Sequence, residues 1–168
     1  MNSTLLVNIS RFILLLAVQI VIFNNMNFLG FIMPLPYMLF IVLYPVNGNR
    51  AALLLASFLL GLTMDVFSNS GGVHAAACLT LAYLRPSIFK FSFGISYEYQ
   101  TIKLNDVLTP ERFSFILISV VIHHFTLFIL EAFQVSFFWD ILIRTLLSTV
   151  FTIISCIIII YLIKPNKR

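Results

Sequence analysis

The chain has 168 residues, of which 61% are hydrophobic and only 10% are charged. Soluble domains are about 25% charged, so this composition excludes a soluble enzyme, a secreted disulfide scaffold and a disordered chain. Ten Lys and Arg residues against six Asp and Glu residues leave a net charge of +4. These cations are spread along the whole chain and do not cluster, so we expect no nucleic-acid partner. The composition predicts an all-α integral membrane protein embedded in the lipid bilayer.

Apolar stretches in the sequence predict a single domain, 1–168, built as a bundle of six transmembrane helices. A membrane-spanning helix needs about 20 apolar residues. The uncharged stretch between Arg11 and Arg50 is nearly twice that length, and it contains Asn24, Asn25 and Pro34. We interpret it as two short crossings, with a single kinked crossing, and hence five spans, as the alternative. The predicted spans are 6–24, 31–47, 51–67, 73–89, 113–130 and 145–163.

The positions of the cations predict the orientation of this bundle. With six spans, only Arg144 falls on one side of the membrane, and nine cations fall on the other: Arg11, Arg50, Arg85, Lys90, Lys103, Arg112, Lys164, Lys167 and Arg168. Cytoplasmic segments of membrane proteins are enriched in Lys and Arg. Both termini and the long loop 86–112 are therefore expected to be cytoplasmic.

Five residues around the end of the third span are candidates for a structural or interaction site. Gly61 and Asp65 are four residues apart and so lie on one helix face, where the glycine lets another helix approach. Gly71 and Gly72 suit a tight turn, and His74 begins the next span. We expect Asp65 to accept hydrogen bonds from the free amides at the start of the fourth helix. The alternative is a proton- or metal-sensitive pair of Asp65 and His74.

The last two spans carry further polar residues inside or near the membrane. His123 and His124 point about 100° apart, so we expect them to make hydrogen bonds between helices rather than to share a metal or relay protons. Glu131 lies near the outer surface. Asp140 and Arg144 are four residues apart, and this spacing predicts an ion pair at the start of the sixth helix.

The 86–112 loop alternates aromatic and polar residues around Phe89–Phe93. This period of two is compatible with a strand or with a segment lying on the membrane surface. We treat the loop as a candidate for cytoplasmic contacts, and a simple tether is the alternative.

Motifs for catalysis, cofactors and metals are missing from the sequence. It contains no GxSxG, GxxxxGK[ST], HExxH or CxxC, the patterns that place nucleophiles, phosphates or metals. Cys78 and Cys156 lie in apolar stretches and are expected to be buried hydrophobes. We therefore expect neither enzymatic activity nor a cofactor. An intramembrane enzyme using Asp65, Glu131 or the histidines is the remaining alternative.

The sequence resembles the MreD family of bacterial rod-shape-determining membrane proteins. The most specific part of the resemblance is Gly61-x-x-x-Asp65-x-x-Ser68-x-x-Gly71-x-x-His74, followed by a helix ending in Tyr83-Leu84-Arg85-Pro86. The His123-His124 pair followed by Leu130-Glu131 is also similar to some members. The first two spans contribute little to the resemblance.

The resemblance implies a non-enzymatic subunit of the cell-wall elongation complex in the bacterial inner membrane, where it helps to maintain rod shape. Its implied partners are the bitopic protein MreC, a RodA-type glycosyltransferase, a class B penicillin-binding transpeptidase and, indirectly, the MreB filament. The implied fold is that of the six-helix substrate-binding subunits of energy-coupling-factor vitamin transporters. That fold implies an alternative function, a small-molecule-binding membrane subunit of a vitamin-type transporter.

Overall fold

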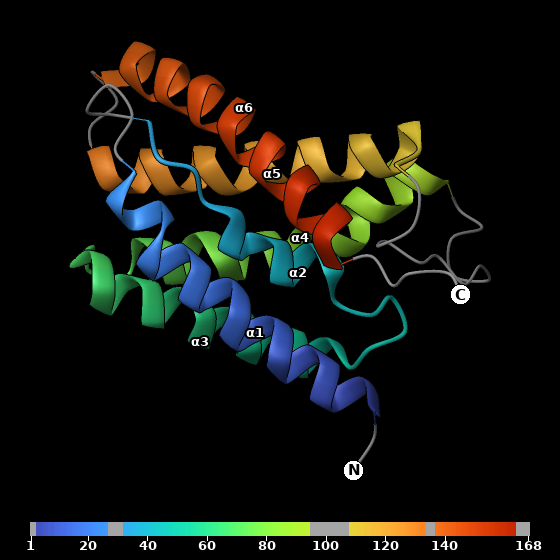
Figure 1. The fold of residues 1–168 in the computed structure, drawn as a ribbon. Helices are drawn as coiled ribbons and strands as arrows, with labels where there is room; N and C mark the ends of the chain where they lie inside the picture. The colour runs from blue at the N-terminus through green and yellow to red at the C-terminus, as the bar shows by residue number, and fades with distance from the viewer. Residues whose placement is uncertain (1–2, 27–31, 95–107, 134–136, 164–168) are drawn as a thin grey trace.

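The computed structural model describes residues 3–26, 32–94, 108–133 and 137–163, and these residues form an almost wholly helical bundle (Figure 1). Its long helices are α1 (Ser3–Val21), α3 (Arg50–Ser68), α4 (Val73–Phe93), α5 (Pro110–Ala132) and α6 (Phe138–Ile163). Three short pieces lie between α1 and α3: the 3₁₀ helices η1 (Phe23–Asn25) and η2 (Pro36–Met38), and α2 (Leu39–Leu43).

Four helical stretches are long and apolar enough to cross a membrane: Leu5–Asn25, Arg50–Ser68, Pro110–Ala132 and Phe138–Ile163. The predicted class, an all-α multi-pass membrane protein, agrees with this finding. The more specific six-span count is not reproduced. Helix α4 is less apolar than these four stretches and contains Arg85 and Lys90. It packs between α3 and α5 and also contacts α2, so it needs less apolar surface facing lipid.

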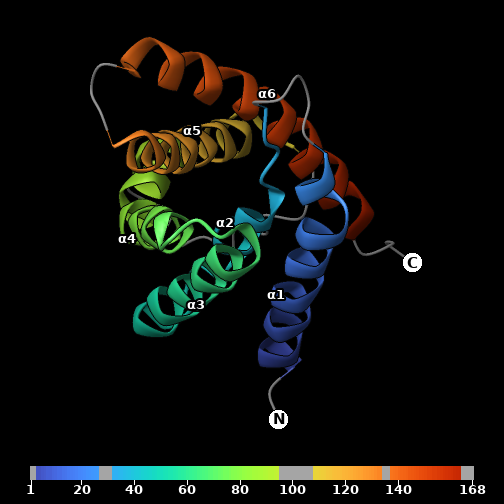
Figure 2. The same cartoon turned by 90° about the vertical axis from the view of Figure 1, so that its left-hand side faces the viewer.

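The long helices follow one another around an arc. Figure 2 shows α3, α4, α5 and α6 succeeding one another along this arc, with α2 inside it and α1 on its open side. Successive helices run in opposite directions (Figure 1). The beginnings of α1, α3 and α5 and the ends of α4 and α6 therefore lie towards one end of the bundle.

The predicted span 31–47 is not a continuous helix, which corrects the sequence interpretation. Proline disfavours helical backbone in the residue before it and donates no hydrogen bond. Leu35, which precedes Pro36, has φ −123° and ψ 60°. Tyr44, which precedes Pro45, has φ −59° and ψ 142° and ends α2. The prolines thus limit regular α-helix here to the five residues of α2.

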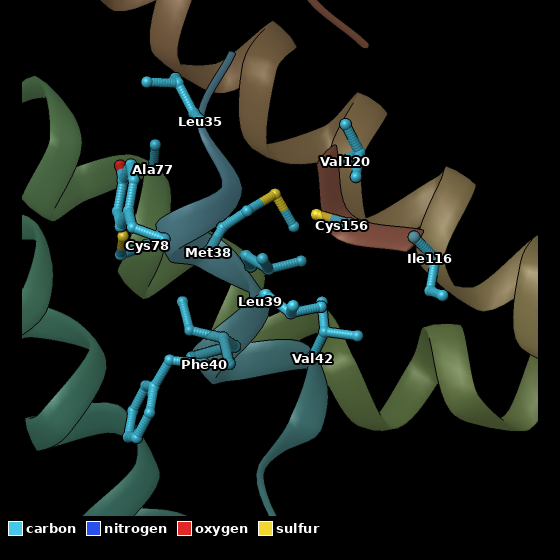
Figure 3. Packing of buried hydrophobic residues seen from close by; sticks show 14 of the residues in the cluster. Leu35, Met38, Leu39, Phe40, Val42, Ala77, Cys78, Ile116, Val120 and Cys156 are labelled. Carbon is cyan, nitrogen blue, oxygen red and sulfur yellow. The ribbon is translucent and has the colours of Figure 1, made fainter. Parts of the chain in front are cut away.

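The segment 32–44, here named the broken segment, doubles back along α1 through the centre of the bundle. Gln19 of α1 donates to the carbonyl of Pro34 at 3.2 Å, and Arg11 donates to the carbonyl of Leu43 at 3.3 Å. Figure 3 shows the segment between Ala77 and Cys78 on one side and Ile116, Val120 and Cys156 on the other. Non-helical backbone is tolerated at membrane depth when protein surrounds it, and this segment meets that condition.

The first part of the predicted 86–112 loop is helical, which corrects the strand-like interpretation of Phe89–Phe93. Helix α4 continues through Pro86 to Phe93. Phe89 and Phe93, four residues apart, stack with ring centroids 5.0 Å apart, and Phe89 packs on Phe115 of α5 at 4.2 Å. Burial of this aromatic cluster favours the helix over the period-two pattern. Residues 95–107 of the loop lie outside the described part of the chain.

Two other helices begin before the predicted spans. Helix α5 begins at Pro110, where the side chain of Thr109 accepts a hydrogen bond from the Arg112 amide. Helix α6 begins at Phe138 rather than at 145. The added first turns of α5 and α6 contain charged residues. The predicted spans are limited to apolar residues and therefore begin later.

Gly61 marks the closest approach of α3 to α4. A Cβ atom at this position would lie 2.5 Å from the Cα atom of Ala75 and 2.5 Å from the carbonyl oxygen of His74. These are backbone atoms, so a rotamer change cannot relieve the clash. We expect Gly61→Ala to lower the free energy of unfolding by about 2 kcal/mol through overpacking. Unfolding in mild detergent measures this effect. Leu62→Ala, at a neighbouring exposed position, is the control, and equal losses from both would contradict the packing argument.

Candidate functional site

Asp65 caps the start of α4 from the end of α3. Its two carboxylate oxygens accept the backbone N–H groups of His74 and Ala75, each at 2.9 Å, and the hydroxyl of Ser70 donates to the same carboxylate at 2.6 Å. The first amides of a helix have no partner within it and favour a negative charge. Gly72 at the N-cap has no side chain to offer. Asp65 therefore makes the contact that the structural interpretation of the sequence expects.

The turn between α3 and α4 requires left-handed backbone. Gly71 has φ +67° and Gly72 has φ +100°, conformations that glycine adopts without a Cβ penalty. Together with the contact at Gly61, this tight turn brings the first residues of α4 onto the Asp65 carboxylate.

Tyr37, in the broken segment, links α4 and α5 at the centre of the bundle. Its fully buried hydroxyl lies 2.8 Å from Nδ1 of His74 and 3.0 Å from Nε2 of His123, and the thiol of Cys78 is 3.7 Å away. Both histidines are candidate residues from the sequence, whereas Tyr37 is not among the predicted ones. A buried tyrosine hydroxyl usually has a hydrogen-bond partner. The position of Tyr37 in the long uncharged stretch is therefore the available signal in the sequence.

The hydrogen-bond chain through Tyr37 ends at His123. The other ring nitrogen of His123, Nδ1, is buried with no hydrogen-bond partner among the described residues. Leaving a buried acceptor unpaired costs less free energy than leaving a buried donor unpaired, so we assign the proton to Nε2, which then donates to Tyr37. Tyr37 then donates to His74. The ending at His123 favours a structural role for the chain over a proton relay.

His124 belongs to a separate chain of hydrogen bonds. Its Nδ1 lies 2.9 Å from the carbonyl oxygen of Val120, which can only accept, so Nδ1 carries the proton. Its Nε2 therefore accepts from the hydroxyl of Thr152 on α6, 3.1 Å away. Thr152 in turn accepts the backbone N–H of Leu35 at 3.0 Å. The two adjacent histidines thus bind different partners, as their angular separation predicts.

The free backbone groups of the broken segment are bound by side chains from the surrounding helices. Gln19 accepts the N–H of Tyr37 at 3.3 Å, in addition to its bond with the Pro34 carbonyl. Ser148 accepts the N–H of Met33 at 3.2 Å. Arg85, only 5% exposed, donates to the carbonyls of Val42 and Tyr44. An unpaired backbone group costs several kcal/mol in hydrocarbon, so these bonds allow the segment to lie inside the bundle.

Helix α6 supplies a buried row of hydroxyl groups that the sequence analysis missed. Thr145, Ser148, Thr149 and Thr152 recur at intervals of three or four residues and are all buried. This spacing places them on one helix face. The same spacing is present in the sequence. The surrounding residues are so hydrophobic that the segment is interpreted only as a membrane span.

Arg144 pairs with Glu131 of α5 and not with Asp140, which corrects the predicted pair. The Arg144 guanidinium lies 3.8 Å from the Glu131 carboxylate and 5.0 Å from the ring centroid of Phe128. Two partners on α5 hold Arg144 better than an exposed carboxylate on its own helix can. Asp140 stays in the first turn of α6, where a negative charge is favourable. Trp139 beside it is 74% exposed.

A cavity of about 440 Å³ opens beside this network, at the end of the bundle where α3 turns into α4. Polar side chains in its wall include Gln19, Asn24, Ser70, His74 and Glu131. His74 thus lies between the cavity and the chain through Tyr37. Within the described ranges, no three His, Cys, Asp or Glu side chains are grouped to hold a metal ion.

We expect Tyr37→Phe to lower the free energy of unfolding by about 2 kcal/mol. The change removes one hydroxyl and leaves two buried histidine nitrogens without their partner, at a cost of about 1–3 kcal/mol for an unpaired buried group. Thermal unfolding in detergent measures this loss. Tyr83→Phe is the matched control, because the Tyr83 side chain is 61% exposed. A neutral Tyr37→Phe would contradict the assigned hydrogen bonds.

The buried side chains of Gln19, Tyr37 and Thr152 therefore bind the histidines or the broken segment, and Asp65 binds the start of α4. Gly61, Asp65, Gly71, Gly72 and His74 come together in one hairpin, whereas His123 and His124 serve two separate chains. Comparisons of this chain with known protein families, with curated proteins and with solved structures found no match.

Proposed function

We propose that this protein is a non-enzymatic inner-membrane subunit of the bacterial cell-wall elongation complex, which acts by binding its partners within the membrane. The proposal rests on the resemblance of the Gly61–His74 hairpin to the MreD family and on how the buried polar residues are used. The proposed partners are an MreC-like bitopic protein, a RodA-type glycosyltransferase and a class B penicillin-binding transpeptidase, with an MreB-type filament as an indirect partner.

One observation carries the non-enzymatic part of the proposal. The buried polar groups most suited to chemistry, Asp65, His74, His123 and His124, are bonded to backbone amides or carbonyls or to the hydroxyl groups of Tyr37 and Thr152. An active site instead keeps such groups directed at a substrate. Their bonding therefore favours a stable bundle with binding surfaces over an intramembrane catalyst.

The lateral helix faces are the surfaces that such a subunit offers. On α6, Leu146, Val150, Ile154 and Ile158 recur every four residues, and each is more than half exposed. Partner helices pack on such faces by close van der Waals contact. The connection between α3 and α4 is only four residues long, so it offers little surface outside the membrane.

Depletion of the protein in a rod-shaped host, combined with purification from its membranes, tests the proposal. We expect depleted cells to become round, and we expect a single-span coiled-coil protein of the MreC type to co-purify with the tagged chain. Retention of normal rod shape after depletion, in a host with no second copy, would contradict the proposal.

The cavity supports a second candidate function, a small-molecule-binding subunit of a vitamin-type transporter. Its volume of about 440 Å³ falls within the range of small-molecule sites, and Gln19, His74 and Glu131 offer it polar groups. A panel of vitamins, tested by the shift of thermal unfolding, separates the two candidates. A specific shift that is lost in Glu131→Gln would favour this function, and no shift with any vitamin would favour the scaffold.

A further inference from the structure

A second hollow lies between α1 and α3, at the end of the bundle where α1 and α3 begin. Its volume is about 750 Å³. Ile9 and Phe12 of α1 form one wall, Ala52 and Ala56 of α3 form the other, and Phe40 of α2 lies between them. Figure 2 shows α1 and α3 diverging towards this end. We name this hollow the α1/α3 groove.

The α1/α3 groove is short enough to lie within one leaflet of a bilayer. Its lining runs from Leu5 to Phe12 on α1 and from Asn49 to Ala56 on α3. At 1.5 Å per residue, each wall is about 10 Å long, compared with about 15 Å for half of the hydrocarbon layer. A transmembrane helix of a partner crosses about 30 Å of hydrocarbon, so the groove would cover only about a third of its length. The groove is therefore suited to the acyl chain of a lipid.

The end of the groove near the starts of α1 and α3 is polar and next to positive charge. Asn8, Asn47 and Asn49 belong to its lining, which contains no carboxylate. Arg50 begins α3 directly after Asn49 and is exposed, next to the lining but outside it, with its guanidinium 5.5 Å from the ring centroid of Tyr83 on α4. Arg11 lies one turn along α1 from Asn8, also outside the lining, where it donates to the carbonyl of Leu43. The N-terminus of α3 adds the positive end of its helix dipole.

We infer that the α1/α3 groove binds one anionic phospholipid of the leaflet on this side. The acyl chain lies between Ile9 and Ala56, and the phosphate lies at the asparagine rim beside Arg50. Only 11% of the most apolar part of Leu5–Asn25 is buried by protein, and the lipid covers part of this exposed surface of α1. The inference requires a bilayer and does not depend on the proposed protein partners.

Native mass spectrometry of the full chain, released from nanodiscs, tests this inference. The nanodiscs contain equal amounts of dioleoyl phosphatidylglycerol and dioleoyl phosphatidylcholine. We expect one retained phosphatidylglycerol on the wild type, its loss in Ala56→Trp, which fills the groove, and its retention in Ala51→Trp, which changes an exposed residue outside the lining. Arg50→Gln should bind it about fivefold more weakly, the contribution of one cation near the surface.

Three results would overturn the inference. Equal retention of the two lipids would contradict the role of charge, and retention in Ala56→Trp would contradict the place of the acyl chain. Loss in the Ala51→Trp control as well would mean that the lipid binds outside the groove. If Ala56→Trp does not fold, Ile9→Trp fills the groove from its opposite wall and has the same expected result.

Discussion

Asp65→Ala is expected to destabilise the protein more than any other single substitution considered. It removes the acceptor of two α4 amides and of the Ser70 hydroxyl, at a site where Asp65 is only 6% exposed. Hydrogen bonds to charged groups contribute about 1.5–3 kcal/mol each, and they are not fully additive. We therefore expect a loss of about 4 kcal/mol in the free energy of unfolding, measured by thermal or denaturant unfolding in mild detergent.

Two further variants define the role of this carboxylate. Asp65→Asn keeps one acceptor oxygen and should lose about half as much stability. Asp140→Ala removes an exposed carboxylate from the first turn of α6 and should cost less than about 1 kcal/mol. If Asp65→Ala unfolded like the wild type, the α3–α4 hairpin would not depend on this cap.

Gln19→Leu has the second-largest expected effect. Gln19 is fully buried and binds both the Pro34 carbonyl and the Tyr37 amide, so it ties α1 to the broken segment. Leucine has a similar size but leaves both backbone groups unpaired, at about 1–3 kcal/mol each. We expect a total loss of about 3 kcal/mol. Hydrogen–deuterium exchange should also become faster within the broken segment while α4 and α5 stay protected.

Ser10→Leu is the control for Gln19→Leu, because it makes a polar-to-apolar change at an exposed position of the same helix. It should leave both unfolding and exchange nearly unchanged. Faster exchange throughout the bundle of Gln19→Leu, at the same rate in every helix, would contradict a local role for Gln19.

Local patterns in the sequence predicted the hairpin well. The Gly61–Asp65 spacing, the Gly71–Gly72 turn and the start of α4 all depend on residues within about one turn of each other or on a single short connection. The observed helices Arg50–Ser68 and Val73–Phe93 begin within one residue of their predicted spans. Short-range chemistry determines these features.

The centre of the bundle could not be predicted in the same way. The hydropathy of residues 31–47 indicates that this stretch is removed from water, but it does not distinguish a helix from a broken segment. Tyr37 contacts His123 across 86 positions of sequence, and the Leu35 amide contacts Thr152 across 117. A single sequence contains no signal for such pairs. Arg144 likewise pairs with Glu131 on α5 and not with its predicted partner Asp140. Tertiary packing outweighs a local charge pair, which contributes only a few tenths of a kcal/mol.

We propose that the buried polar residues maintain the bundle and that the protein acts through binding by the folded bundle. The most direct test plots cell shape against the amount of folded protein in the membrane. The test replaces the chromosomal copy in a rod-shaped host with the wild type or with Asp65→Asn, Gln19→Leu, Tyr37→Phe or the double variant His123→Ala with His124→Ala. We predict that rod shape depends only on the amount of folded protein and recovers with raised expression. A variant folded at the wild-type level that leaves the cells round would contradict the account.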